Sequence, residues 1–381
     1  MALLVFGADI VPTKSNERFF IEGNIKYLFR DGLLEYLEKA DFKCFNLECP
    51  LTNETEKVYH PNPHFKAKPD TINGFKTLHP SLLTIGNNHA LDQGQVGIKS
   101  TIRVLKEAGI PFIGAGKNAE DASKPYYCEL DGCKVGIYTC SEYECSAATE
   151  RRYGANHYDP LISFDQVRNM KKNCDVAIIL YHGGKEHYQY PSPNMQRICR
   201  KFVEYGADLV ICQHTHCIVC EEKYRDATIV YGQGNVLLDN YEIEVRMTSI
   251  LVECLIENNR IVRVNYVPIK KMRECVRKAD AIESKQILDG FFKRSLEIQK
   301  PGFIQSEYDK LAKEYYEGYV RKITGNHRII NKLNRLLGGR IYRYFYNREK
   351  AESVINIINT ENHAELFAAG LRLIGRDQKP E

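Results

Sequence analysis

The sequence predicts an α/β fold in which helices cover a β-sheet, followed by a helical C-terminal region. Up to about Lys270, short apolar runs of strand length alternate with segments of helical periodicity. Two longer alternating runs then flank Asn258–Asn259, which is a β-hairpin pattern. Beyond Lys270 the strand-like runs end, so we expect an α/β domain over residues 1–270 and a helical region over residues 271–381.

Eight apolar runs have the length and composition of buried strands. In chain order they are Leu3–Phe6, Cys44–Leu47, Leu82–Ile85, Phe112–Ile113, Val135–Tyr138, Val176–Leu180, Leu209–Ile211 and Thr228–Tyr231. The clearest helical segments between them are Asp31–Lys39, Gly97–Ala108 and Asn194–Tyr205, and the hairpin strands are expected at Val245–Ile256 and Arg260–Pro268. This alternation favours helices packed against a sheet.

Composition excludes several classes of protein. With 381 residues, 43% hydrophobic and 27% charged, the chain can bury a sizeable core. A net charge of +4 without a binding motif argues against a nucleic-acid partner. The 13 Cys have no framework spacing, which indicates reduced thiols. Because neither a signal peptide nor a long apolar span is recognisable, we expect a cytoplasmic protein, at most peripheral to the inner face of the membrane.

Polar residues of catalytic type follow five of the predicted strands. Ligand sites in open α/β sheets gather at the carboxyl ends of strands. One histidine after a strand is more often a loop residue than a ligand. Core packing, however, gives no reason for potential metal ligands to follow five different strands. Imidazole and carboxylate ligands suit Mn²⁺, Fe or Zn²⁺ better than Mg²⁺, so the set predicts a divalent metal site. Its candidates are Asp9, Asn46, Glu48, Asn88, His89, Asp92, His182, Glu186, His214 and His216.

These motifs, in this order, resemble the CapA branch of the calcineurin-like metallophosphoesterase superfamily, which serves capsule and polyglutamate biosynthesis. The matching patterns are Asp, Asn-x-Glu, Asn-Asn-His-x-x-Asp, His-x-Gly-x-Glu and His-x-His, and Tyr231–Asn235 resembles the family's Tyr-Ser-Leu-Gly-Asn. The resemblance covers about residues 3–240. It implies a four-layer α/β/β/α sandwich of the metallophosphoesterase type with a helical C-terminal extension.

The resemblance also implies a role for each candidate residue. Two divalent metal ions would be held by Asp9 and His216 on one side, by Asn88, His182 and His214 on the other, and by Glu48 as the bridge. His89 would serve as general acid or charge stabiliser, oriented by Asp92. Glu186 would orient His182, bind metal or contact the substrate, and Tyr231 and Asn235 would line the substrate side. Val11 stands where the wider superfamily has a histidine ligand, which predicts a weaker first metal site.

Several of these residues have a simpler structural interpretation. Asn46 and Asn88 could be turn residues that bond to the backbone, and Asp92 could cap the following helix. The group Cys212, Cys217 and Cys220 could form a structural zinc site, although its spacing matches no standard frame and buried thiols are favoured.

The function expected from these patterns is a CapA-like metal-dependent hydrolase, with a phosphoester as the favoured bond, in capsule, polyglutamate or surface-polysaccharide metabolism. The alternative is a non-catalytic, metal-binding assembly subunit of such a synthesis complex. The expected substrate is an anionic small molecule or polymer. Residues His327–Arg348 carry six Lys/Arg and no acid among apolar residues. They could contact a membrane or a biosynthetic complex, although a helix packed by its apolar face is the more common case.

Overall fold

The computed structural model describes residues 1–56, 63–239, 243–323 and 328–345, together with isolated positions between 350 and 367. The chain forms two compact units, Met1–Gln305 and Ser306–Glu381. The first unit continues past the expected boundary near 270, because two further elements join it. Strand β16 (Val276–Lys278) extends a sheet, and helix α9 (Ala281–Glu297) packs on two strands.

The first sheet has eight strands in the order β2-β16-β15-β14-β1-β3-β4-β5. Its parallel part consists of β1 (Ala2–Ile10), β3 (Phe42–Leu47), β4 (Leu82–Thr84) and β5 (Phe112–Ile113). β1 also pairs with β14 (Thr248–Glu257), which forms the predicted hairpin with β15 (Arg260–Lys271). Asn258 and Asn259 have φ of 51° and 58°, as a type I′ turn requires. The short β2 (Phe29–Arg30) closes the edge.

The second sheet has six strands in the order β12-β13-β11-β10-β8-β7. Four of them are parallel, namely β8 (Cys133–Ser141), β10 (Val176–His182), β11 (Leu209–Gln213) and β13 (Ala227–Val230). The antiparallel edges are β7 (Tyr126–Leu130) and β12 (Glu221–Tyr224). A separate pair joins β6 (Ala115–Gly116) to β9 (Gly154–Ala155). These two edge strands of the second sheet were not predicted, because β7 and β12 are only half-buried.

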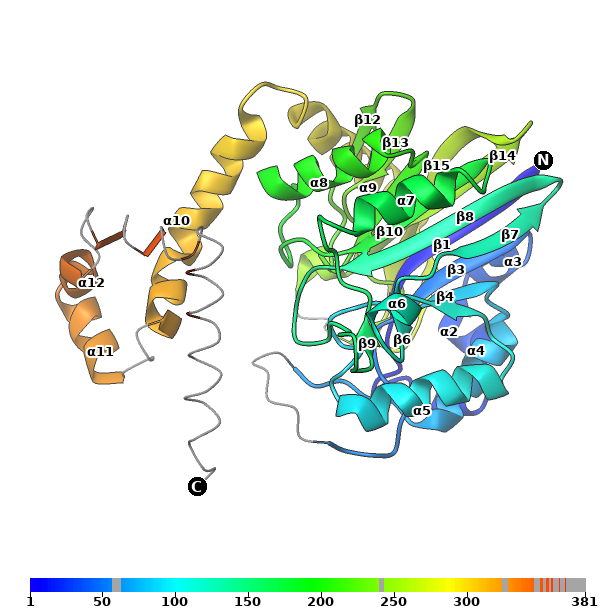
Figure 1. Ribbon diagram of the computed structural model, residues 1–381, viewed down its shortest axis with the longest axis horizontal. Coiled ribbons are helices and arrows are strands. Elements are labelled where there is room, and N and C mark those ends of the chain that lie inside the picture. Colours follow the sequence, from blue (N-terminus) through cyan, green and yellow to red (C-terminus); the bar gives the residue numbers. More distant parts are fainter. Residues whose placement is uncertain are drawn as a thin grey trace. The chain divides into compact units, whose positions relative to one another are not determined.

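Three hydrophobic clusters separate the layers of the first unit. One contains inward residues of both sheets, including Phe6, Ile137 and Ile178, and therefore lies between the sheets. The second joins the first sheet to the helices α1 (Glu17–Ile21), α2 (Ile25–Leu28), α3 (Leu33–Leu37), α4 (Ile72–Leu78) and α5 (Gly94–Glu107). The third joins the second sheet to α7 (Ser163–Lys171) and α8 (Pro193–Glu204). The order is therefore helix, sheet, sheet, helix (Figure 1), which confirms the four-layer prediction.

The remaining described elements are helical. The short α6 (Ala119–Ala122) lies beside β6 and β9. Helix α10 (Phe303–Ile323) begins in the first unit, and α11 (Arg328–Leu336) and α12 (Arg340–Phe345) belong to the second. Gly338 and Gly339, both with positive φ, separate α11 from α12. Among the described residues, no helix combines the length and the hydropathy needed to cross a bilayer.

Candidate metal centre

The predicted ligands meet where parallel strands of both sheets end. Asp9 lies near the end of β1, Glu48 follows β3, and His182 is the last residue of β10. His214 and His216 follow β11 and have φ of 85° and 54°, a left-handed conformation that is uncommon for residues other than glycine. Such strain gathers at functional sites, where the surrounding structure holds it in place. Both sheets therefore contribute to one buried cluster.

Two overlapping groups of side chains can each hold a metal ion. Asp9, Glu48 and His182 form one group, and Glu48, His214 and His216 form the other. Within each group the ligand atoms lie within 4.8 Å of one another, and all five side chains are buried. Glu48 is common to both groups. A carboxylate shared in this way is the arrangement that a two-metal site needs for its bridging ligand.

Four potential ligand atoms of this cluster lack a hydrogen-bond partner. Within the described part of the chain, Asp9 Oδ2, both oxygens of Glu48 and Nδ1 of His214 are buried without a hydrogen bond. His182 Nε2 lies 3.2 Å from Glu48 Oε1, but this contact lacks hydrogen-bond geometry. Leaving such groups unsatisfied costs about 1–3 kcal/mol each. A divalent cation would satisfy them together, so these residues fit a metal site.

Burial favours the uncharged form of three of the ligand side chains, Glu48, His182 and His214. Burial, followed by the charge of Asp9, raises the pKa of Glu48 well above its ordinary value. Burial lowers the pKa of His182 to about 4, and burial together with the neighbouring imidazoles lowers that of His214 well below its usual range. Both histidines are therefore neutral at pH 7, which is the form that binds metals.

Asp9 responds differently to the same burial. Burial alone would raise its pKa, but the nearby imidazoles of His216, whose Nδ1 lies 3.6 Å from Asp9 Oδ2, and of His182 outweigh that effect and lower it. Asn46 also donates from Nδ2 to Asp9 Oδ1 at 2.7 Å. The Asn46 oxygen in turn accepts from Thr84 Oγ1 and from Asn87 Nδ2, each at 3.1 Å. Asn46 therefore orients a metal ligand and is not simply a turn residue.

The loop after β4 brings Asn88 and His89 to the cluster. Asn88 Oδ1 lies 3.0 Å from His182 Nε2, and Asn87 Nδ2 donates to the carbonyl of Leu47 at 2.8 Å. His89 is buried and its Nδ1 lies 2.7 Å from Asp92 Oδ2. The residue at the capping position of α5 is Gln93, so Asp92 does not cap that helix. Asp92 is positioned to orient His89, as the resemblance implies.

His89 is held in a setting that favours its protonated form. Burial lowers the pKa of His89, but the hydrogen bond to Asp92 and the charge of Glu48 raise it more, so the net shift is upward. Phe65 packs against the imidazole with ring centroids 4.3 Å apart. The backbone N–H of Phe65 also donates to Asp92 Oδ2 at 2.5 Å. The side chain is therefore fixed in place and suited to donate a proton.

Two residues expected on the substrate side have other positions. Tyr231 is fully buried in the core between the second sheet and α8, and its hydroxyl donates to Glu222 Oε2 at 2.6 Å. It is therefore a core residue, and the prediction that it lines the substrate side is corrected. Asn235 Oδ1 lies 2.8 Å from His216 Nδ1, so it orients a ligand instead. The carbonyl of Asp9 accepts from Val236 and Leu237, which fixes this loop to β1.

No sequence motif pointed to Arg246, the residue that pairs with Glu186. Arg246, at the end of the short 3₁₀ helix Glu244–Arg246, places Nη2 at 3.3 Å from Glu186 Oε2. Its Nε donates to Nε2 of His187. Glu186 therefore neither orients His182 nor belongs to either metal group, and it lies at the rim of the site. Arg246 lies at the start of the predicted hairpin strand Val245–Ile256 and belongs to none of the ligand motifs, so only the pairing of β14 with β1 brings it here.

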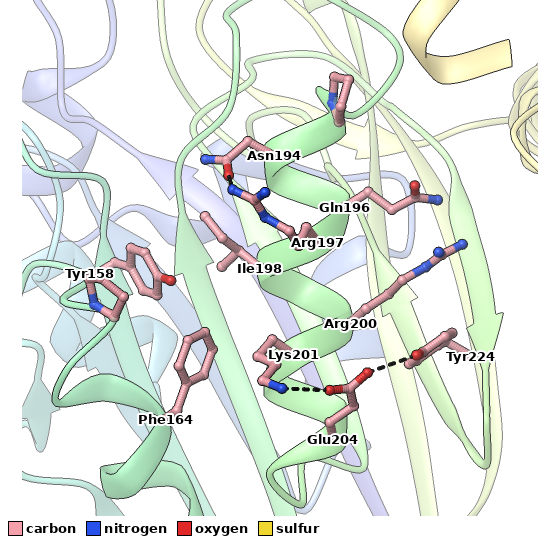
Figure 2. Close-up of a pocket in the computed structure, with 12 residues that line it drawn as sticks. Tyr158, Phe164, Asn194, Gln196, Arg197, Ile198, Arg200, Lys201, Glu204 and Tyr224 are labelled. Atoms are coloured by element: carbon pink, nitrogen blue, oxygen red, sulfur yellow. Dashed lines mark hydrogen bonds and ion pairs between the residues drawn. The ribbon is translucent and has the colours of Figure 1, made fainter. Parts of the chain in front are cut away.

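The cysteines and a groove along α8 lie apart from this centre. Cys212, Cys217 and Cys220 are buried, burial raises their pKa values, and no cysteine occurs in either metal group of the described residues, so these thiols are structural. A groove of about 780 Å³ runs along α8 (Figure 2). Its cations already have partners, since Lys201 pairs with Glu204 and Arg200 with Glu222. None of the predicted site residues lines this groove.

The chain is similar in sequence to proteins of capsule biosynthesis. A capsule biosynthesis protein CapA from Bacillus anthracis is 29% identical over 252 residues, which is 64% of this chain and 61% of that protein. The chain thus matches less than two thirds of that relative's length. A PGA biosynthesis protein CapA from Bacillus subtilis strain 168 is 26% identical over 296 residues, 74% of this chain and 78% of that protein. A phosphatase structure from Mycoplasma pneumoniae aligns with a TM-score of 0.43 and 13% identity, covering 76% of this chain and 98% of that one.

The family comparison covers the centre itself. A family model described as bacterial capsule synthesis protein PGA_cap matches residues 4–240, more than half of the 381 residues. That stretch contains both groups of metal-ligating side chains and the pair His89 and Asp92. The chain belongs to the PGA_cap family of bacterial capsule synthesis proteins.

Proposed function

We propose that this chain is a metal-dependent hydrolase of phosphoesters that acts in capsule, polyglutamate or surface-polysaccharide metabolism. The observation that carries the proposal is the buried Glu48, shared by two groups of ligand side chains, with the His89–Asp92 pair beside it. Two divalent ions, of Mn, Fe or Zn, would be held by Asp9, Glu48, Asn88, His182, His214 and His216. When bound, such ions polarise a phosphoryl group and lower the pKa of water.

The protein's own contribution to the reaction is orientation and proton transfer. Asp92 is bonded to Nδ1 of His89, which leaves Nε2 as the atom that would donate a proton to the leaving oxygen. Asn46 and Asn235 fix Asp9 and His216 respectively. The cluster is almost entirely closed to water, which strengthens each electrostatic interaction within it.

The experiment combines metal analysis with hydrolysis. Purified wild type should carry metal and hydrolyse p-nitrophenyl phosphate or its bis-ester in the presence of Mn²⁺. His182→Ala should lose metal and activity together, because His182 lies among Asp9, Asn88 and Glu48. Leu161→Asp, at an exposed surface position, is the matched control and should change neither. Absence of metal and of turnover in wild type and variant alike would overturn the proposal.

A second role, as a membrane-associated assembly subunit, is favoured by one observation in the second unit. Ile329, Leu333, Leu336 and Leu337 recur at helical spacing and are all exposed, between 45% and 73%. The contact between α11 and α12 is polar instead, because Tyr342 bonds to Asn331 and Asn334. The described residues 329–344 contain Lys332, Arg335, Arg340 and Arg343 and no acid. His327 and residues 346–348 of the predicted basic segment lie outside the described residues.

An outward apolar face with basic neighbours matches the chemistry of an anionic lipid surface. We propose that α11 lies on such a surface and holds the hydrolase unit near its polymer. The full chain should sediment with phosphatidylglycerol vesicles and not with phosphatidylcholine vesicles. The double variant Leu333→Asp, Leu336→Asp should lose this binding, and Leu161→Asp should retain it. Equal sedimentation of all three proteins would rule out α11 as the contact.

A further inference from the structure

We propose that Arg246 forms an anion-binding wall of the metal centre and restricts it to substrates with an oxyanion beside the bond to be cleaved. This inference rests on the proposed hydrolase function and deepens it by naming the substrate class. The oxyanion is a phosphoryl group or a carboxylate, since both match the planar array of guanidinium donors.

The fold places Arg246 at the same sheet edge as the metal ligands. It immediately precedes β14, which pairs with β1, the strand that carries Asp9. The start of β14 is tied to the loop of Asn235, because the N–H of Ile250 donates to the carbonyl of Gln233 at 2.9 Å. Arg246 itself is only 6% exposed. The guanidinium is therefore shielded from solvent and lies against Glu186 and His187.

Loops from two other strands hold the guanidinium. Glu186 and His187 come from the loop after β10, and they bind Nη2 and Nε of Arg246 respectively. The backbone of His187, at a left-handed φ of 62°, donates to the carbonyl of Thr215, which lies between the two ligand histidines. The ring of His187 is 6.3 Å from that of His216. Arg246 is thus braced by the same loops that carry the ligands.

The bracing leaves one nitrogen of the guanidinium unused among the described residues. Among the described residues, the bonds of Arg246 use Nε and Nη2, so Nη1 remains available for a ligand. Burial lowers the pKa of Arg246, and the charges of Glu186 and Glu48 oppose this shift, which places Glu48 within electrostatic reach. Glu186 is the acid paired with this cation among the residues that the structure describes, and its side chain is 41% exposed. A substrate anion between the metal ligands and Arg246 would gain a charge-assisted contact.

The competing explanation is that Arg246 only fixes the loop after β10. Ligand binding separates the two explanations. Inorganic phosphate is titrated by calorimetry into Mn²⁺-loaded wild type, Arg246→Gln and Arg246→Lys, and L-glutamate serves as a carboxylate probe in a second series. Metal content and melting temperature are measured for each protein. The variant Glu186→Gln tests whether the contact between Glu186 and Arg246 is needed to hold the guanidinium in place.

For Arg246→Gln we expect about ten- to a hundred-fold weaker binding of the oxyanion at unchanged metal content, the range for one charge-assisted hydrogen bond. Arg246→Lys should recover part of this loss, and KM should rise more than kcat falls. The probe whose binding depends on Arg246, phosphate or glutamate, identifies the class of oxyanion. The inference is overturned if Arg246→Gln binds both probes as wild type does, or if its only defect is lost metal. If wild type binds phosphate through Arg246 but hydrolyses no substrate, the proposed hydrolase function is refuted and the proposed anion site is supported.

Discussion

At the scale of single residues, the metal centre opposes the folding of the metal-free protein. Glu48 has two buried oxygens without partners and a neighbouring carboxylate in Asp9. Because its pKa is raised in the folded state, the folded protein binds a proton there more tightly than the unfolded chain does. The stability that this proton contributes is complete below the ordinary pKa of the carboxyl group and is lost as the pH rises through the raised pKa. Metal ions and protons therefore compete for this carboxylate.

Replacing Glu48 tests this competition directly. In EDTA, Glu48→Gln should melt at a higher temperature than wild type at pH 8, because the amide avoids burying a charge. The difference should shrink as the pH falls and wild type binds its proton. Mn²⁺ should raise the melting temperature of wild type and not of the variant. Glu35→Gln, at an exposed site, is the control. Identical melting of wild type and Glu48→Gln at pH 8 would contradict the assignment.

His89 and Asp92 make a separable prediction about catalysis. His89→Asn should lower kcat by about 10²–10⁴-fold, the usual contribution of a general acid, without loss of metal. Asp92→Asn should act more mildly, because it removes the hydrogen bond that raises the pKa of His89. An acid works only while protonated, so the alkaline limb of the pH–rate profile should move to lower pH. An unmoved limb, measured at constant metal content, would mean that another group supplies the proton.

At the scale of elements, the strand pattern predicted the positions of the ligands well. Each of the eight predicted runs overlaps a strand, with Ile85 and Tyr231 just beyond the strand ends. Asp9, Glu48, His182, His214 and His216 lie at or after strand ends. Periodicity alone could not divide these strands between two sheets, and that division came from the family resemblance. The prediction for Tyr231 was wrong, although the alternation of side chains along its strand indicates a position in the core. Along a strand every second side chain points to the same face. Tyr231 is two residues after Ile229 and four after Ala227, which face the helices, whereas Val230 faces the other sheet.

Arg246 shows what sequence patterns cannot supply. No spacing links it to His187 or Glu186, and it reaches them only because β14 runs antiparallel beside β1. The boundary near 270 failed to anticipate β16 for a similar reason, since a three-residue edge strand has too little pattern to recognise. Contacts that depend on tertiary pairing are therefore found only in the structure.

The loop that carries Asn88 and His89 depends on a close approach of two backbones. A Cβ at Gly86 would lie 2.6 Å from the carbonyl oxygen of Gly114 and 2.9 Å from its Cα. Backbone atoms cannot give way as a flexible side chain can, so Gly86→Ala should shift the loop after β4. We expect about 1–3 kcal/mol lower stability, together with weaker Mn²⁺ binding.

The matched control for this prediction is Gly290→Ala in α9. There the new Cβ meets only the end of Arg294, at 3.4 Å. An alanine in a helix interior should be neutral or stabilising by up to about 1 kcal/mol. Urea unfolding and Mn²⁺ titration measure both variants. Wild-type Mn²⁺ affinity in a folded Gly86→Ala protein would show that this contact does not position the ligand loop.

At the scale of the whole molecule, the proposed metal chemistry and the proposed membrane contact belong to different compact units. Each metal-ligating side chain, His89 and Arg246 belong to Met1–Gln305. The exposed apolar face of α11 belongs to Ser306–Glu381. Phe303 and Ile304, in the first turn of α10, contribute to the hydrophobic core beside α8. A truncation that spares this turn should therefore remove the second unit without opening the first.

We expect a chain that ends at Lys310 to keep the metal content and phosphoesterase activity of the full-length protein within about two-fold, because it retains each partner of the metal centre. Its thermal unfolding should remain cooperative. It should no longer sediment with phosphatidylglycerol vesicles, since α11 and its basic residues are gone. The full chain carrying Leu333→Asp and Leu336→Asp should reproduce that loss without truncation. Vesicle binding by the truncated chain would place the membrane contact on the first unit. Loss of metal from a folded, truncated chain would instead show that the second unit supports the centre.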